Sequence, residues 1–400
     1  MSLSCTVLQR DREALSHERP RAETRLGTGR ARQAVRGARA GVDLGEERPA
    51  LCGRRIAPVT PDLLLPYDDT EPTFAARPVW CGRGSAVIGR ASLGAQAWLG
   101  DESVIRADGH DVVVGDRFWL GARSTLHIAA EMYPCIVGDR VTVGRDAVVH
   151  ACTVGDECVI EEECVVLDGS VIEDGVLLEA GSTVFPRTTL PAGFVCAGSP
   201  ARPVRPLAPG ELAERAERLR EAAAAEPAPG PGEAFAADPA VFVARTARLH
   251  GRVALAAGAS VFFSCRLEAG LGPIVIGSNV NVQDNCALHT RADGLVIGHD
   301  TTLGHNVRAG DGRIGPHCLV GMGARLGPGT VVEADVLVAA GSATDPGQVL
   351  DSGWLWGGRP ARKLARLDSE RRAMMARTVA SYAAYGRTFR RLQARSGGEG

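Results

Sequence analysis

Two segments of this chain, 160 residues apart, each hold one histidine where the other segment holds none. Alignment sets Arg145 against His305, and five residues later it sets His150 against Gly310. Imidazole is both a common general base and the commonest metal ligand among side chains. The complementary losses indicate either one functional set divided between the segments or the remnants of two decayed sites. The segments are VTVGRDAVVHACTVG at 141–155 and TTLGHNVRAGDGRIG at 301–315.

The sequence around these histidines follows a period of six. A period of six fits neither an α-helix, at 3.6 residues per turn, nor a plain alternating strand. It is typical of a β-helix, whose short strands turn a corner every six residues and place one aliphatic side chain inward on each edge. Early aliphatic positions are Val87, Leu93, Leu99 and Ile105. The longest run is Val154, Ile160, Val166, Ile172, Leu178 and Val184.

The whole pattern occurs twice, because matching aliphatic runs return 160 to 162 residues later. The second series begins at Leu249, Leu255, Val261 and Leu267. We therefore expect a mainly β chain with two parallel β-helix domains, each followed by an α-helix. The predicted ranges are 1–56 for an Arg-rich disordered tail, 57–207 for the first β-helix, 208–233 for a helix and Pro/Gly linker, 234–367 for the second β-helix and 368–395 for a C-terminal helix.

Both predicted helices carry an apolar face, and such a face is typical of packing against a core. We expect the last helix to begin at Asp368 or Ser369 as N-cap. No cofactor role is expected for either apolar face. The face of the first helix holds Leu212, Ala216, Leu219 and Ala223, and that of the second holds Met375, Val379 and Tyr382.

Composition excludes several classes of function. The 400 residues have a formal net charge of −2, with 45 Lys and Arg against 47 Asp and Glu, so no basic footprint for nucleic acid is present. No signal-like apolar region and no run of about 18 apolar residues occurs, so we expect no membrane segment. The eleven cysteines lack C-x-x-C spacing, which favours reduced thiols and a cytoplasmic location. The tail, 1–56, is a solvated segment, an over-extended start of translation or an arm for an acidic partner.

Both halves of the chain resemble the γ class of carbonic anhydrases, which are left-handed hexapeptide-repeat β-helices. The likeness covers 62–207 and 234–367. It implies a zinc ion held by three histidines at a boundary between protomers of a trimer, the first and third from one protomer and the second from its neighbour. The motifs are SVIRADG, similar to an Arg-Gly-Asp segment, NVNVQDNCALHT, similar to an Asn-x-Gln-Asp…His segment, and VVHACTVG and TTLGH, similar to the two halves of a Gly-His-x-x-x-x-His stretch.

Neither half keeps the full set of site residues that the resemblance implies, but the two halves together retain every element. In the first half, Arg145 replaces the second histidine ligand, and the Gln-Asp pair is absent. In the second half, Gly310 replaces the third histidine ligand, and the Arg and Asp are absent. The first half keeps Arg106, Asp108, His127 as first ligand and His150 as third ligand. The second half keeps Gln283, Asp284, His289 as first ligand and His305 as second ligand.

The resemblance also implies roles for these residues. If the two halves meet in the right sense, His127, His150 and His305 complete one zinc site and His289 is left as an orphan. Three neutral imidazoles with an open water position bring the pKa of the water near about 7, which suits hydration of carbon dioxide or another small electrophile. Arg106, paired with Asp108, is expected to orient an anionic product or to brace the boundary. Gln283 is expected to hydrogen-bond the attacking oxygen. Asp284 is expected to hold a loop in its conformation.

Assembly and alternatives stay open at this point. We expect a homo-oligomer, trimeric or pseudo-trimeric through its β-helix faces, that acts on a small molecule. Since a ring of three domains cannot alternate two kinds, zinc is expected to be substoichiometric, or absent if the duplicated fold has lost its metal. A CoA-dependent acyltransferase with His127 or His289 as general base, or a zinc-less scaffold, are the alternatives. The other histidines are expected at the surface or in packing: His110, His250, His299 and His317.

Overall fold

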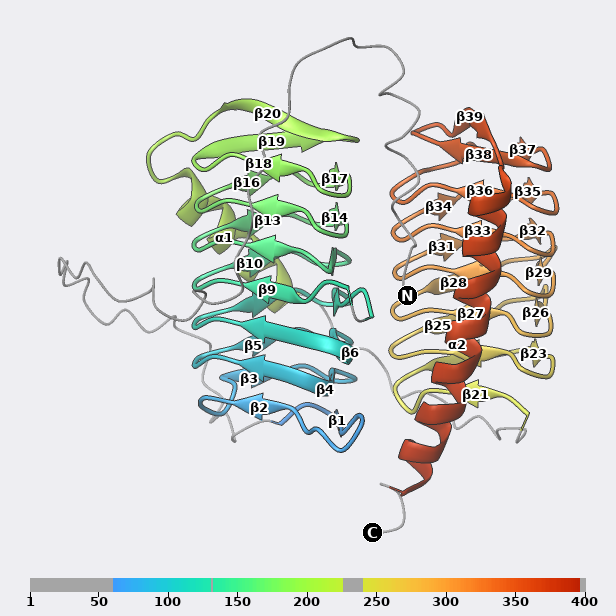
Figure 1. Cartoon of the computed structure of the whole chain (residues 1–400), viewed down its shortest axis with the longest axis horizontal. Coiled ribbons are helices and arrows are strands. Elements are labelled where there is room, and N and C mark those ends of the chain that lie inside the picture. Colours follow the sequence, from blue (N-terminus) through green and yellow to red (C-terminus); the bar gives the residue numbers. More distant parts are fainter. Residues whose placement is uncertain (1–59, 131, 226–239, 396–400) are drawn as a thin grey trace. The chain divides into compact units, whose positions relative to one another are not determined.

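The computed structural model describes residues 60–130, 132–225 and 240–395. The predicted tail and the 226–233 part of the predicted linker lie outside the described residues. The described residues form two parallel β-helices, each followed by an α-helix, so the predicted fold class is confirmed (Figure 1).

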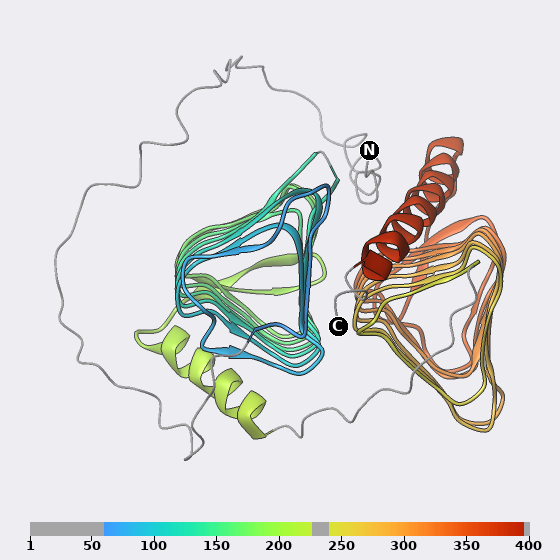
Figure 2. The same cartoon turned by 90° about the horizontal axis from the view of Figure 1, so that it is seen from below.

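The first β-helix has three faces that form a triangular coil (Figure 2). One face is a sheet of eight strands, and the other two share a sheet of 12 strands because β4 and β6 continue across a corner. The eight are β3 (Trp80–Cys81), β5 (Trp98–Leu99), β7 (Trp119–Leu120), β10 (Thr142–Val143), β13 (Val159–Ile160), β16 (Leu177–Leu178), β19 (Phe194–Gly198) and β20 (Ala201–Pro206). The 12 are β1 (Leu63–Leu65), β2 (Thr73–Phe74), β4 (Ala86–Leu93), β6 (Val104–Val114), β8 (Thr125–His127), β9 (Cys135–Val137), β11 (Val148–His150), β12 (Thr153–Val154), β14 (Val165–Val166), β15 (Val171–Ile172), β17 (Thr183–Val184) and β18 (Thr189–Leu190).

The second β-helix is also triangular and has one sheet on each face. The first face holds β21 (Phe242–Val243), β24 (Ser260–Val261), β27 (Asn281–Val282), β30 (Thr302–Leu303), β33 (Leu319–Val320), β36 (Leu337–Val338), β38 (Trp354–Gly357) and β39 (Arg362–Arg366). The second holds β22 (Arg248–His250), β25 (Arg266–Ala269), β28 (Ala287–Thr290), β31 (Arg308–Ala309) and β34 (Arg325–Leu326). The third holds β23 (Val253–Leu255), β26 (Ile274–Ile276), β29 (Leu295–Ile297), β32 (Gly312–Ile314), β35 (Thr330–Val332) and β37 (Val349–Leu350).

The period of six arises from this geometry. Val165 pairs in parallel with Val148 in the preceding coil and with Thr183 in the following one, so one coil takes about three hexads. The six aliphatic residues spaced from Val154 to Val184 are at most 1% exposed and line the interior. The hexad positions therefore supply the core, and the corners between them are free to carry polar side chains outward.

Each α-helix covers part of one face of its β-helix (Figure 1). Helix α1 (Glu211–Ala225) packs Ala216 and Leu219 against Val159 and Leu177. Helix α2 (Ser369–Arg395) lies along β21, β24, β27 and β30. The backbone N–H of Arg371 donates to the carboxylate of Asp368 at 2.7 Å, so Asp368 is the predicted N-cap.

The predicted apolar face of α2 is buried, although its Tyr382 has a polar partner described below. On α1, Ala216 and Leu219 are buried, and Leu212 and Ala223 are half-buried. No helix in the described part of the chain is long and apolar enough to cross a membrane. The nine cysteines among these residues are all buried and free of disulfides.

Candidate metal centre

Three histidines converge where the first β-helix meets the second. His127 and His150 end strands β8 and β11 in adjacent coils and are register partners. His305 lies in the turn after β30. Nδ1 of His127 lies 3.1 Å from Nε2 of His150 and 3.1 Å from Nε2 of His305. The sequence split these residues between the two halves, and the fold brings all three together within one chain.

The outer nitrogen of each imidazole lies against a carboxylate. Nε2 of His127 is 2.9 Å from Asp108, and Nδ1 of His150 is 2.6 Å from Asp168. An ionised carboxylate only accepts hydrogen bonds, so it fixes the proton of a neutral imidazole on the outer nitrogen. The inner nitrogens of His127 and His150 then present lone pairs to each other.

The third imidazole also has a carboxylate beside its outer nitrogen, but without the hydrogen-bond geometry of the other two. Nδ1 of His305 lies 3.2 Å from Oδ2 of Asp284. Burial lowers the pKa of His305 to about 4, although Asp284 acts to raise it. Burial, with the charge of Arg106, also holds the pKa of His127 well below its usual value. Both imidazoles are therefore neutral at pH 7, and lone pairs rather than protons face the centre of the cluster.

The geometry of the three histidines is that of a binding site for a small divalent cation. Converging lone pairs repel one another unless a proton or a cation lies between them. Tetrahedral zinc with Zn–N bonds of 2.0–2.1 Å separates its imidazole nitrogens by about 3.3 Å, close to the two distances of 3.1 Å. All three ligand nitrogens lie within 4.8 Å of one another, and all three side chains are buried. Neutral imidazoles backed by carboxylates are the donor set that zinc prefers.

Arg106 braces this centre from below the surface. Its side chain is fully buried; Nη1 donates to Asp108 and Nε donates to Asp284 at 2.9 Å. Burial acts to lower the pKa of Arg106, but the two carboxylates raise it well above its usual value. The guanidinium thus joins the carboxylate behind His127 to the carboxylate behind His305. Of the two roles expected for Arg106, the contacts are those of a brace.

Helix α2 adds a tyrosine to the centre. Nη2 of Arg106 donates to Oη of Tyr382 at 3.2 Å, and Oη lies 3.5 Å from Nε2 of His305. Burial raises the pKa of Tyr382 far above its usual value, so the phenol keeps its proton at pH 7. Tyr382 was expected only as a core residue of the helix face. Its hydroxyl is the signal that could have corrected this, because a buried phenol oxygen requires a polar partner.

Asp168 is a second residue that the sequence analysis missed. It lies 18 residues after His150, which is one coil of the β-helix. Side chains one coil apart lie side by side, so the period of six predicts that Asp168 lies beside His150. The period was used to identify aliphatic positions, and it could also have identified this polar pair.

A polar boundary holds the two halves of the centre in register. Asn306, next to His305, donates from Nδ2 to the carbonyl of Arg123 at 2.7 Å. Its Oδ1 accepts from Thr125, at the start of the strand that ends at His127, at 2.9 Å. Asn285 also donates to Thr125, at 2.9 Å. The histidine-bearing strand of one β-helix is thereby hydrogen-bonded to the histidine-bearing turn of the other.

Buried charges reinforce the same boundary. Glu102, buried in the first β-helix, accepts from Arg123 of its own domain at 3.0 Å and from Arg266 of the second at 2.7 Å. It also pairs with Arg248 at 3.0 Å. Nη2 of Arg123 also donates to the carbonyl of Asn285 at 2.8 Å. A carboxylate shared by three guanidinium groups stabilises the contact that aligns the histidines.

The other predicted site residues also have partners besides the three histidines. Gln283 is buried and donates to Asn281 at 3.3 Å. Asp284, whose Oδ2 lies beside His305, accepts at Oδ1 from the backbone N–H of Phe263 at 3.0 Å. His289 is 60% exposed and pairs with Glu268 at 3.3 Å. It belongs to neither of the two possible metal clusters in the described residues.

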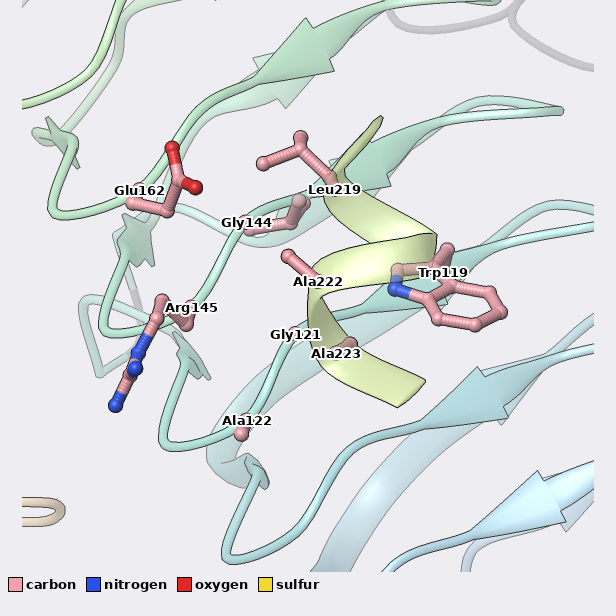
Figure 3. A pocket seen from close by; sticks show the side chains of 10 residues that line it. Trp119, Gly121, Ala122, Gly144, Arg145, Glu162, Leu219, Ala222 and Ala223 are labelled. Atoms are coloured by element: carbon pink, nitrogen blue, oxygen red, sulfur yellow. The ribbon is translucent and has the colours of Figure 1, made fainter. Parts of the chain in front are cut away.

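Arg145, the residue in place of the first half's second ligand, lies at a different surface. It lines a pocket between α1 and the coils of the first β-helix (Figure 3). Its Nε pairs with Asp146 at 3.1 Å. None of the three clustered histidines lines this pocket, whose walls are Trp119, Gly121, Ala122, Val143, Gly144, Arg145, Glu162, Leu219, Ala222 and Ala223.

Comparison with known proteins agrees with this fold. A family model described as the hexapeptide repeat of succinyl-transferase matches residues 134–167 and 313–345. The mitochondrial γ carbonic anhydrases 1 and 2 of Arabidopsis thaliana are 33% and 35% identical over 152 residues, which is 36% of this chain and 55% of each relative. The chain thus spans about half the length of these curated relatives.

A solved structure is similar as well. The hexapeptide transferase family protein from Anaplasma phagocytophilum is 33% identical, with a TM-score of 0.36. The match covers 38% of this chain and 89% of that protein.

Proposed function

Since this chain is a γ carbonic anhydrase-like hexapeptide-repeat protein, we propose that His127, His150 and His305 bind one zinc ion and that the site hydrates a small electrophile. Carbon dioxide is the substrate that the similarity favours. The observation that carries this proposal is the convergence of three imidazoles whose outer nitrogens each lie against a buried carboxylate.

Each part of the centre has a task in this function. His127, His150 and His305 would hold the zinc ion, which would supply a bound water with its pKa lowered to about 7. The carboxylates of Asp108, Asp168 and Asp284 orient the imidazoles and increase their basicity. The phenol of Tyr382, protonated and 3.5 Å from His305, can hydrogen-bond a molecule beside the histidines.

The stoichiometry of the proposal is one zinc at this centre per chain. The proposed ligands come from both halves of a single chain, so the proposal needs no mixed ring of separate domains and predicts full rather than substoichiometric zinc at this centre. The faces that carry Arg145 and His289 remain available for contacts between chains. We keep a homo-oligomer and the cytoplasm as proposals, the latter because the nine described cysteines are free.

The first test is metal content. Purified chain, offered zinc and freed of excess, is measured by elemental mass spectrometry beside His150→Ala, His305→Ala and the control His289→Ala. We expect zinc at this centre to disappear in the first two variants and to remain in the control. Hydration of carbon dioxide, followed by stopped-flow pH indicator, should fall with it.

The alternatives correspond to other outcomes of the same test. If chain that has been offered zinc binds none at these histidines, the hydratase proposal is wrong. Turnover of acetyl-CoA would then support the acyltransferase, and the absence of both activities would support the scaffold. No contact of the described residues favours either alternative over zinc.

A further inference from the structure

A second group of metal-ligating side chains lies at a corner of the second β-helix. We propose that His299, Asp300 and His317 form a second binding site for a divalent transition-metal ion such as zinc. One ligand atom from each residue lies within 4.8 Å of the others. None of the three belongs to the motifs that resemble the carbonic anhydrases, and both histidines were expected only at the surface or in packing.

Backbone pairing holds the two imidazoles together. His299 precedes β30 and His317 precedes β33, and these strands pair in parallel through Thr302 and Leu319. The backbone N–H of His317 donates to the carbonyl of His299 at 3.1 Å. The ring centroids are 4.9 Å apart, with the ring planes at 87°. The spacing of the coils therefore keeps the imidazoles close without help from an ion.

The carboxylate of Asp300 completes the donor set. Its Oδ2 lies 2.8 Å from Nδ1 of His299, and its Oδ1 accepts from Asn279 at 2.9 Å. The hydrogen bond from Asn279, which lies outside the donor set, holds the carboxylate of Asp300 beside the imidazoles.

The chemistry of this set suits zinc. Two imidazoles and one carboxylate are three protein ligands of a common zinc site, which leaves a position for water. The His299 side chain is 54% exposed and that of Asp300 is 36% exposed, so an ion enters from solvent and the side chains can rotate to meet it. The next carboxylate along this corner, Asp335, is already paired with Arg372 at 2.9 Å. The site is therefore limited to the three named residues.

An ion at this corner would clamp two successive coils of the β-helix. Strand β30 begins two residues after Asp300, and His305 follows it. The clamped coil is thus the one that carries the second half's ligand to the candidate metal centre. The expected role is structural, because the donors face solvent.

The test counts zinc ions in the full chain. Chain stripped with chelator is dialysed against buffered zinc and measured by elemental mass spectrometry. We expect two zinc ions in the unmodified chain, one in His317→Ala, one in His299→Ala/His317→Ala, and two in the control His250→Ala, which removes another exposed histidine of this β-helix. The His305→Ala variant should also hold one zinc ion, and the double variant His305→Ala/His317→Ala should hold none.

The outcomes separate this site from the candidate metal centre. A single zinc that His305→Ala removes and His317→Ala does not would leave the proposed function intact and overturn the second site. A single zinc ion that His317→Ala removes and His305→Ala does not would support the second site and overturn the proposed function. Half-saturation above about 10 µM zinc, measured against a competing chelator in His305→Ala, also overturns the proposal and reduces the cluster to a hydrogen-bonded surface pair.

Discussion

At the scale of single residues, the candidate centre depends on which ring nitrogen of each of the three imidazoles carries the proton. Each imidazole has a carboxylate on its outer side, and burial keeps His127 and His305 neutral. The inner nitrogens are then acceptors that face one another, with the Tyr382 hydroxyl 3.5 Å from Nε2 of His305. This arrangement predicts how the site responds to loss of a carboxylate and to acid.

Replacing Asp168 with asparagine should weaken zinc binding without unfolding the chain. An amide accepts one hydrogen bond from His150 but adds no charge, and loss of such partners typically costs 10- to 100-fold in metal affinity. Competition with a fluorescent chelator measures the change. The matched control is Glu268→Gln, which alters the same kind of pair at the orphan His289 and should have no effect. Equal loss in both variants would contradict the role given to Asp168.

Acid should destabilise the metal-free chain before its surface carboxylates titrate. The pKa of His305 is about 4 in the folded chain and about 6.5 when unfolded. Its contribution to the free energy of unfolding is therefore complete above pH 6.5 and is lost as the pH falls toward 4. The loss amounts to about 3 kcal/mol. Urea unfolding at pH 7.5 and 4.5 measures it, and His305→Asn should reduce the difference; an unchanged difference would contradict the buried neutral state.

At the scale of elements, α2 matters because it carries Tyr382 to the centre. Its close approach depends on Gly386, where a Cβ would lie 3.3 Å from Cβ of Ser260 and 3.5 Å from Cβ of Phe242. A Cβ there is already in tight contact, so a side chain as large as valine requires the helix or its neighbours to shift. The position of the helix, and with it the phenol, is therefore set by a residue that touches no ligand.

Gly386→Val should lift α2 from its face and lower the free energy of unfolding by about 1–3 kcal/mol, the usual cost of overpacking. Thermal unfolding followed by circular dichroism measures the loss. Ala384→Val places the same side chain on the exposed side of the same helix and should change stability little. If both variants unfold alike, the close packing at Gly386 does not hold the helix.

At the scale of the whole molecule, one chain unites two unlike β-helices through a boundary rich in buried charge. Glu102 pairs with guanidinium groups from both halves. Breaking a buried ion pair on one side typically costs 3–5 kcal/mol, because a charge is left without its partner. The boundary and the metal centre should therefore fail together.

Glu102→Gln tests this coupling. It should lower the free energy of unfolding by about 3 kcal/mol and release zinc, since His305 is then no longer held against His127 and His150. The control Glu157→Gln removes an exposed partner of Arg140 and should cost no more than about 1 kcal/mol. Full zinc content in a destabilised Glu102→Gln chain would show that the centre does not depend on this boundary.

Much of this molecule was predictable from sequence. The hexads identified the interior, because an aliphatic residue such as Ile160 recurs at every inward edge. The complementary histidines indicated either a shared site or two decayed ones, and their positions within the repeat predicted their positions on a coil. The boundary was not predictable, since Asn306 and Thr125 are 181 residues apart and the repeat places residues on a coil but does not say which faces of the two β-helices meet. Tyr382 was missed for the same reason: its partner Arg106 lies in the other half.

The most direct measurement is the X-ray absorption spectrum at the zinc edge, recorded on His299→Ala/His317→Ala so that only the central ion contributes. The account predicts three imidazole nitrogens and one oxygen at about 2.0 Å, and no zinc at this centre after His305→Ala. Sulfur ligands, or a spectrum that His305→Ala leaves unchanged, would contradict a centre built from both halves of the chain.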